Sequence, residues 1–564
     1  MITRTSVGTE GWCGDTGMSH RLSCQDGPER RFGRFPIKFC SVFESLVAMG
    51  QMHFDVPDAA NEFFESTRWE DAYLCGIEGV PWQSRNVYSN GRFTLTRGVD
   101  TSAKLFLTCP IPSIGYRQLS TCSLRCLANP HRLFVELARG SCYRVRVQAD
   151  VWQRGGLVLS DRFDDLLTRG TKRFLDASQC APESPSCVEA AMEAIEALEL
   201  ASNELGDLFA SQSVAYRRSR ENRLCTMLAV GVLPPLPATE VTPDIQSGRA
   251  GNSIDEQTTI TRAFNAAAVR INWGEIETDS GRPNYEPVDE ALTACSQMGL
   301  RVIGGPVIDY RKGLLPDWLT LLDDDFDKLM STTISFVEKT VEHFRGRVNL
   351  WNAASGLNVA GPLGFDDEQV MRFSIGILQT IRRCDPNTPV LMSLDQPCGE
   401  YLARDEQGIS PLHFADALLR SGLGLAGIGL NFRFGFEEGD THPRSAVEFG
   451  QIIDRWATLN APLMVQLSVA GAPGKDASAR LPIQTRPLSP DISDDPDAWA
   501  KAQFEFVQPL IQTLLSKQIV HAVVWDGWSD QHAHLTPHAG VIDAKGRPRP
   551  MLAYLTKIRE EMLM

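Results

Sequence analysis

The sequence lacks any long apolar run. No uninterrupted apolar stretch approaches the roughly 20 residues that cross a bilayer, and the segment FCSVFESLVAMG (residues 39–50) is interrupted by Glu44. We therefore expect neither a transmembrane helix nor a signal peptide, which predicts a cytoplasmic location.

Basic residues are outnumbered by acidic ones. The chain has 55 Lys and Arg against 70 Asp and Glu, which gives a formal net charge of −15. Such a balance repels the phosphates of nucleic acids and the headgroups of anionic lipids. We therefore expect neither nucleic acid nor a membrane as a partner, and the composition specifies no protein partner.

Paired cysteines are absent as well. The 14 cysteines include no CxxC pair, and Cys142, Cys225 and Cys295 lie in apolar patterns where a buried thiol acts as a small hydrophobe. Cys122 and Cys126 are close together, but they lack the second Cys or His pair of a structural zinc site. The sequence predicts a reducing compartment, no metal and no cofactor.

At 564 residues the chain is too long for one ordinary core, and changes in its hydrophobic period divide it into segments. Alternating runs such as FTLTRGV, RLFVELARGS and YRVRVQADVW predict strands, SCVEAAMEAIEALELASNELGDLF predicts a helix, and GVLPPLPATEVTPDIQSGRAGNS predicts a linker. The predicted segments are a poorly ordered extension (1–48), a small β-sandwich-like module (49–158), a helical hairpin (159–230), a linker (231–254) and a C-terminal domain (255–564).

The C-terminal domain alternates short apolar runs with amphipathic helices. Seven runs stand out as strands: AAAVRINW, LRVIGGPVI, RVNLW, PVLMSL, LAGIGLNF, PLMVQLSV and HAVVWDG. An eighth strand is expected within 371–393 or near Ile260. This rhythm over about 300 residues predicts a parallel (β/α)8 TIM barrel, whose site lies at the C-terminal ends of the strands.

Several phrases of this domain occur in the order found in one family of barrels. FNAAAVRINWGEIETDSGRPNYEPVDEAL, LRVIGGPVIDYRKGLLPDWL, FRGRVNLWNAASGLN, CDPNTPVLMSLDQP and APLMVQLSV resemble successive strands of glycoside hydrolase family 10, the xylanase-type barrels. With the segments that precede it, the chain resembles a subgroup that carries an N-terminal β module. The resemblance implies an endo-1,4-β-xylanase-type fold acting on carbohydrate.

Both catalytic carboxylates of that family are missing. The resemblance places Gly356 at the position of the acid/base Glu, and Gln466 or Leu467 at the position of the nucleophile. No Asp or Glu occurs between Glu342 and Asp366, or between Asp454 and Asp476, so no small shift of alignment restores either carboxylate. Because retaining hydrolysis needs two carboxyl groups across the bond, the family's reaction is not expected.

The predicted mouth of the barrel still offers amide, charged and aromatic side chains, which suit a sugar ring. The residues expected to bind substrate are Asn272, Trp273, Asp309, Asn352, Asn431, Arg433, Trp525, Asp526, Trp528 and Asp530. Structural roles are the alternative: Trp273 and Trp525 could fill the barrel, and Asp526 and Asp530 could cap the last helix.

Three functions remain open on the sequence alone. The first is a degenerate barrel that binds a glycan without cleaving it. The second is an active glycosidase with relocated acids, and the third is an intracellular scaffold protein. The candidate acids for the second are Glu275, Glu277, Asp309, Asp395, Asp526 and Asp530. A structure in which no two of these acids lie within about 10 Å across the mouth would end the second hypothesis, since even inverting enzymes need about 6.5 to 9.5 Å.

Overall fold

The structure is a computed structural model that describes residues 50–181, 184–234, 256–322, 324–404 and 408–564. All of these residues belong to one compact unit, Ala48–Met564. The extension predicted over 1–48 and most of the linker predicted over 231–254 lie outside the described residues.

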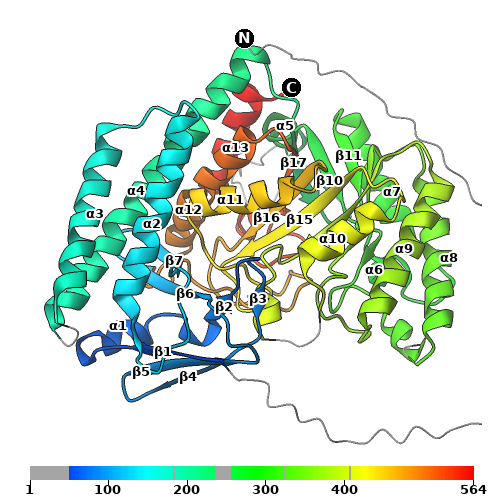
Figure 1. Cartoon of the computed structure of the whole chain (residues 1–564). Helices are drawn as coiled ribbons and strands as arrows, with labels where there is room; N and C mark the ends of the chain where they lie inside the picture. The colour runs from blue at the N-terminus through cyan, green and yellow to red at the C-terminus, as the bar shows by residue number, and fades with distance from the viewer. Residues whose placement is uncertain (1–49, 182–183, 235–255, 323, 405–407) are drawn as a thin grey trace, which may run out of the picture. The chain divides into compact units, whose positions relative to one another are not determined.

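The strand-rich N-terminal region forms two four-stranded sheets (Figure 1). The first has the order β4 (Arg85–Ser89), β5 (Arg92–Arg97), β1 (Gly50–Asp55) and β8 (His131–Arg132). The second has the order β3 (Pro81–Trp82), β2 (Tyr73–Cys75), β6 (Lys104–Ile111) and β7 (Gly115–Ser120). Alternate side chains such as Phe93, Leu95, Leu105 and Leu107 are buried in a shared core, as the period-two pattern predicts.

One stretch of this region differs from the sequence prediction. The runs RLFVELARGS and YRVRVQADVW, expected as strands, form a single helix, α2 (Leu133–Arg154). Its buried positions include Leu133, Leu137, Val145 and Ala149, which are separated by multiples of four residues and lie on one helical face. The alternation in YRVRVQADVW is therefore outweighed by the helical period of the apolar residues over the whole of α2.

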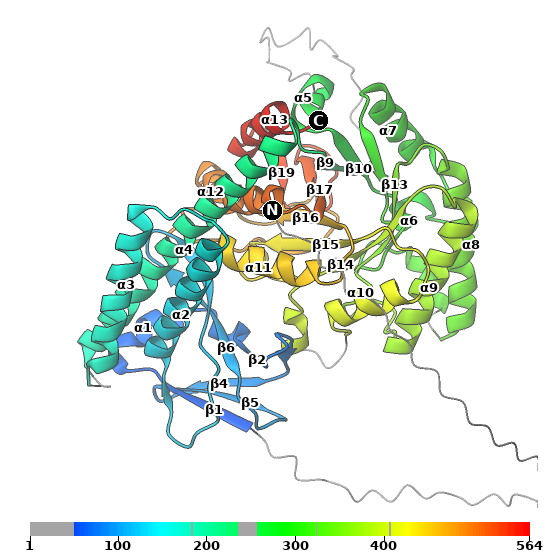
Figure 2. The ribbon, with the colours of Figure 1, turned by 45° about the horizontal axis from the view of Figure 1, so that its top comes forward.

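Two further helices complete the part before the barrel. They are α3 (Asp161–Gln179), capped by the side chain of Ser160, and the 36-residue α4 (Pro185–Arg220). Both views of the ribbon show α2, α3 and α4 packed side by side (Figures 1 and 2). The predicted helical hairpin thus corresponds to α3 and α4, and α2 packs against it.

Eight parallel strands close into a ring, which confirms the predicted (β/α)8 barrel. In order they are β9 (Met227–Val232), β10 (Ala266–Val269), β11 (Arg301–Gly304), β13 (Leu350–Ser355), β14 (Val390–Asp395), β15 (Gly427–Phe434), β16 (Leu463–Val469) and β17 (Val520–Trp525). The ring closes because β17 pairs with β9. Strand β9 is the one that the sequence did not locate: residue 260 lies in α5, and residues 371–384 lie in α9.

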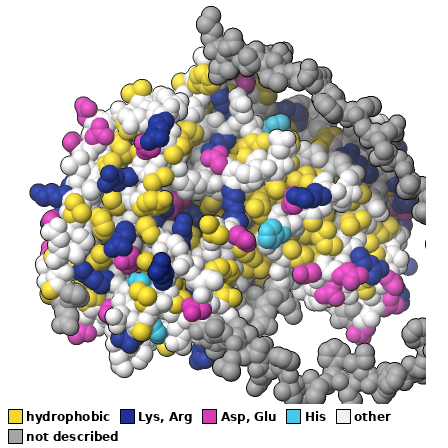
Figure 3. Space-filling view, viewed as in Figure 1, with side chains coloured by type: hydrophobic (Ala, Val, Ile, Leu, Met, Phe, Trp, Pro, Cys, Tyr) yellow, Lys and Arg dark blue, Asp and Glu magenta, His cyan; other side chains and the backbone are white. Residues whose placement is uncertain are grey.

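Helices surround the strands on the outside (Figure 2). They are α5 (Glu256–Ala263), α7 (Glu286–Gln297), α8 (Phe326–Phe344), α9 (Asp367–Cys384), α10 (Pro411–Arg420), α11 (Ala446–Ala457), α12 (Pro496–Ser516) and α13 (Pro550–Met562). Within the described part of the chain, every helix is too short or too polar to span a bilayer. On the face seen in Figure 3, basic side chains are dispersed among acidic and hydrophobic ones.

Side chains of the barrel strands alternate between two apolar clusters. One cluster lies between the strands and the helices and includes Val230, Trp351, Leu467 and Trp525. The other fills the interior and consists of Ala229, Ala266, Ala268, Ile303, Leu391, Met464, Ala522 and Val524. The same alternation continues toward the C-terminal ends of the strands, where the inward-facing residues are polar or charged. These positions form the mouth of the barrel.

Candidate functional site at the barrel mouth

The inward positions of neighbouring strands are paired in register, so their side chains meet. Asp395 of β14 pairs with Asn431 of β15, which pairs with Gln466 of β16. The polar residues that occupy this end of the interior are Arg270, Asn352, Ser393, Asp395, Asn431, Arg433, Gln466, Ser468 and Asp526, and all of them are buried. Buried charges must be paired or hydrogen-bonded, so the partners of these groups define the chemistry of the mouth.

Asp526, just after β17, accepts four bonds from different parts of the barrel. Nη2 of Arg270 lies 2.6 Å away, Nε2 of Gln466 donates at 2.7 Å, and Oγ of Ser468 donates at 2.8 Å. The hydroxyl of Thr536 donates to the same carboxylate oxygen, Oδ2, as Ser468. Burial by itself raises the pKa of Asp526, but Arg270 and these hydrogen bonds outweigh it and lower the pKa.

Asp395, at the end of β14, is the centre of a second set of contacts. Nη2 of Arg433 lies 3.2 Å from Oδ2, and Nε of Arg311 lies 3.8 Å from the same atom. Asn431 donates to Oδ1 at 2.7 Å, and Ser355 donates to it at 3.2 Å. Burial opposes ionisation, yet Arg433 and Arg311 lower the pKa of Asp395 below its usual value.

Asp309 joins the two sets. Nε of Arg311 donates to its Oδ1 at 2.6 Å, and Nη1 of Arg270 lies 3.6 Å from its Oδ2. A continuous series of alternating charges therefore runs around the mouth, from Asp526 through Arg270, Asp309 and Arg311 to Asp395. Each of these three carboxylates faces at least one guanidinium, so the acids brought together here are neutralised by arginine.

Several buried polar atoms at this end of the barrel have no hydrogen-bond partner among the described residues. They include Oδ1 of Asn272, Oδ1 of Asn352, Oγ of Ser393 and Oδ1 of Asn431. The positions of the last three face the interior, and Asn431 holds its amide nitrogen against Ser355 and Asp395. A buried oxygen without a donor costs about 1 to 3 kcal/mol. The mouth therefore presents acceptors suited to a ligand rich in O–H or N–H groups.

The two positions that the resemblance aligns with the family's carboxylates lie at the end of β13 and within β16. Gly356 follows β13 with a φ of +78°, and a Cβ there would lie 3.2 Å from Cγ of Arg311. Of the two residues at the nucleophile position, Gln466 faces the interior and bonds Asp526, whereas Leu467 packs against the helices.

The tryptophans expected at the mouth make other contacts. Trp273 stacks on Phe336 of α8 with ring centroids 4.5 Å apart, and its Nε1 donates to Glu277 at 2.7 Å. Nε1 of Trp525 donates to the carbonyl of residue 539, and the ring lies in the outer apolar cluster. Trp528 packs edge-on against Phe264 and borders a small cavity, of about 30 Å³, next to Arg270 and Asp526. The binding roles of these tryptophans stay predictions.

The other expected residues divide into two places. Asn352, Asn431, Arg433, Asp309 and Asp526 meet at the mouth, with Asn272 following β10. Asp530 lies in the loop after β17, where Nη1 of Arg549 is 2.7 Å from Oδ2 and the backbone N–H of residue 540 donates to Oδ1 at 2.8 Å.

Two arginines of the mouth, Arg270 and Arg311, were not among the expected site residues. Arg270 follows the apolar run AAAV directly, and Arg311 follows DY after the apolar run VIGGPVI. A charged side chain at the end of a buried strand needs a buried partner. That rule could have identified both arginines as residues of the mouth.

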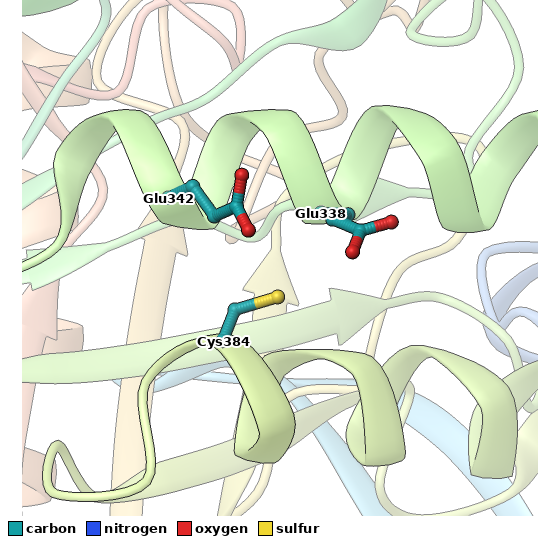
Figure 4. A group of neighbouring side chains, drawn as sticks. All are labelled: Glu338, Glu342 and Cys384. Atoms are coloured by element: carbon teal, nitrogen blue, oxygen red, sulfur yellow. The ribbon is translucent and has the colours of Figure 1, made fainter.

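A separate group on the outer face of the barrel includes Glu338 and Glu342 of α8 and Cys384 of α9 (Figure 4). Glu338 forms an ion pair with Arg383 at 3.2 Å. Burial raises the pKa of the Cys384 thiol, which keeps it protonated, and a protonated thiol is a poor metal ligand. We assign this group a structural role in the contact between α8 and α9.

The closed ring of eight parallel strands and the polar mouth define a (β/α)8 barrel protein whose ligand site, by the general rule for this fold, lies at the C-terminal ends of its strands.

The sequence is similar to endo-1,4-beta-xylanase B of Thermotoga neapolitana, with 20% identity over 306 residues, covering 52% of this chain and 80% of that protein. No family model matches the sequence. Similar solved structures include xylanase 10B of Thermotoga maritima (14% identity, TM-score 0.44, 61% of this chain and 98% of that chain). A GH10 endoxylanase from a sugarcane soil metagenome is another (12% identity, TM-score 0.44, 59% and 97%).

Proposed function

We propose that the barrel mouth binds a carbohydrate, of the class taken by xylanase-type barrels, without hydrolysing it. The observation that carries the proposal is the set of buried oxygens without donors, on Asn352, Ser393 and Asn431, at inward positions of three adjacent strands. Sugar hydroxyls can donate to such oxygens and can accept from neighbouring guanidinium groups such as that of Arg433. The likeness in sequence to a xylanase supports this class of ligand.

The charge arrangement argues against cleavage. Both inverting and retaining glycosidases need one carboxylic acid that is protonated when the bond breaks, and such acids have raised pKa values. The pKa values of Asp395 and Asp526 are instead lowered by their arginine partners. Asp309 is held between Arg270 and Arg311. The relocated-acid hypothesis therefore lacks a proton donor in Asp395 and Asp526, the two mouth carboxylates whose pKa is lowered.

Hydrogen bonding, not ring stacking, is the expected basis of affinity. Trp273 stacks on Phe336 and Trp525 lies in the outer apolar cluster, so the proposal rests on hydrogen bonds and not on these two rings. Each neutral hydrogen bond contributes a net 0.5 to 1.5 kcal/mol, or about 2- to 12-fold in affinity. We therefore expect a weak complex with a short oligosaccharide.

Isothermal titration calorimetry of the full chain with xylobiose, xylotriose, cellobiose and mannobiose tests the proposal. We expect saturable binding of at least one sugar. Asn352→Ala and Asn431→Ala should each weaken it by about 2- to 12-fold, whereas Asn222→Ala, at an exposed position after α4, should leave it unchanged.

A reducing-end assay on the same sugars tests the claim that the barrel does not hydrolyse them. No release of reducing ends above buffer is expected over a day. Absence of binding to every sugar in the panel would overturn the carbohydrate assignment. Hydrolysis that is abolished by Asp395→Asn or Asp526→Asn would overturn the claim that the barrel does not cleave its ligand.

A further inference from the structure

Two loops beside the mouth bring two carboxylates and two imidazoles together. Asp476 lies between β16 and α12, whereas Asp530, His534 and His538 lie between β17 and α13. The ligand atoms of Asp476, Asp530 and His534 all lie within 4.8 Å of one another. From this geometry we propose that the cluster binds a zinc ion, which joins the seventh and eighth loops at the barrel rim.

The spacing of Asp476, Asp530 and His534 fits three ligands of a four-coordinate ion, and His538 lies next to Asp476. Zinc bonds of about 2.0 to 2.2 Å to N and O place neighbouring ligand atoms about 3.3 Å apart in a tetrahedron. Oδ2 of Asp476 lies 2.8 Å from Nε2 of His534 and 3.3 Å from Nδ1 of His538. Nε2 of His534 lies 3.9 Å from Oδ1 of Asp530. The three distances bracket the expected value, so only small shifts of side chains are required.

The ring of His534 is oriented as in many metal-binding histidines. Its Nδ1 lies 2.7 Å from the carbonyl oxygen of His532, and that contact requires a proton on Nδ1. In the neutral ring the lone pair is then on Nε2, which points at the carboxylate of Asp476 at 2.8 Å. A lone pair facing a carboxylate needs a cation between them, and that cation is either a metal ion or a second ring proton that makes His534 an imidazolium. A backbone carbonyl that fixes the other ring nitrogen is a common second contact of a zinc-bound histidine.

Asp530 is held in place independently of the ion. The backbone N–H of Gly540 donates to Oδ1 at 2.8 Å, and Nη1 of Arg549 lies 2.7 Å from Oδ2. Arg549 cancels one of the two carboxylate charges, so a divalent ion leaves the cluster with a single positive charge. The side chains of Asp476 and His538 are 8% and 14% exposed, so the cluster is not completely closed to solvent.

The loops that carry these residues already run side by side. The backbone N–H of Arg480 donates to the carbonyl of His534 at 2.9 Å, and that of Leu481 donates to Leu535 at 3.0 Å. An ion bound to both loops would hold them together beside the mouth. One of its ligands, Asp530, lies four residues after Asp526. The site is separate from the sugar-binding proposal and uses different side chains.

Titration of the metal-stripped full chain with ZnCl2 tests the site. We expect one zinc per chain by calorimetry and by elemental analysis after dialysis, and a rise in Tm of about 2 to 4 °C at saturation. Loading with Co2+ should give the intense visible absorption of a four-coordinate ion with nitrogen ligands, a readout that needs no variant.

Asp476→Asn and His534→Gln should each weaken zinc binding by at least about 10- to 100-fold. Glu338→Gln, in the group on α8, should leave it unchanged. The competing arrangement places a proton, in the form of an imidazolium, between His534 and Asp476. A wild-type chain that binds no zinc, or binding that survives both ligand substitutions, would support that arrangement and overturn the zinc site.

Discussion

Nη2 of Arg270 lies 2.6 Å from Oδ1 of Asp526, with both side chains buried in the barrel mouth. The contact links β10 to the end of β17 across β9, so three adjacent strands depend on one ion pair. Because Arg270 also faces Asp309, it compensates two buried carboxylates at once.

Replacing this arginine tests how much the mouth depends on it. Arg270→Met should lower the free energy of unfolding by about 3 to 5 kcal/mol, because it leaves two buried carboxylates without that cation. Urea denaturation at pH 7 measures the change. Arg262→Ala, which breaks an exposed pair with Glu560, should cost less than about 1 kcal/mol. Equal effects of the two substitutions would contradict the assigned role of Arg270.

Gly356, which the resemblance aligns with the family's acid, is held in a conformation that favours glycine. Gly356→Ala should destabilise the chain by about 1 to 2 kcal/mol, since its φ of +78° is costly for other residues. Gly98→Ala is the control, because Gly98 has no positive φ and no neighbour within 4 Å of an added Cβ. Differential scanning calorimetry of both variants would reveal the difference. A neutral Gly356→Ala would show that a side chain fits there.

Gln466 and Leu467, which the resemblance aligns with the family's nucleophile, should respond differently to substitution. Leu467→Ala should cost about 2 to 5 kcal/mol, because it opens a cavity between β16 and the helices. Gln466→Ala should cost about 1 kcal/mol, since Asp526 keeps Arg270, Ser468 and Thr536. Guanidinium denaturation would rank them. The reverse ranking would mean that β16 presents the other face to the mouth.

A buried histidine predicts how stability varies with pH. Burial chiefly lowers the pKa of His442 to about 4, although Glu400 and Asp71 oppose the shift. The unfolded chain binds this proton near pH 6.5, so stability is complete above that pH and falls as the pH approaches 4. The loss attributable to His442 is at most about 3 kcal/mol.

Chemical denaturation at several pH values between 7.5 and 4.5 measures this dependence. His442→Gln should flatten it while keeping a group that can bond Thr108, whose Oγ1 lies 3.0 Å from Nδ1. His521→Gln, at an exposed position on β17, should leave the slope as it is. An unchanged slope in His442→Gln would assign the pH dependence to other groups.

Most of the barrel could be predicted from the sequence because its strands are short apolar runs separated by long amphipathic helices. β9 was missed because its six residues run directly into a segment rich in proline, whose composition indicates a linker. α2 was taken for strands because YRVRV alternates over a distance too short to distinguish the two periods. In both cases contacts with distant segments decide the structure: β9 pairs with β10 and β17, and α2 packs against α3 and α4.

The mouth was predictable only in part. Polar residues at strand ends, such as Asn431 and Asp526, could be placed there because they cannot face the apolar shell. Trp273 and Trp525 could not, because a tryptophan fits either side and a shift of one residue reverses the side it faces. The pairing of Arg270 and Arg311 with distant carboxylates also depends on the register between strands.

The position of β9 limits how this chain can be divided into fragments. Six residues separate this strand from the end of α4, and it pairs with β10 on one side and β17 on the other. A fragment that started at residue 255 would leave two hydrophobic strands with unsatisfied backbone edges, which favours pairing between molecules. Such a fragment should be insoluble on expression. A fragment that retains Met227–Val232 can pair this strand with both β10 and β17 and so close the barrel.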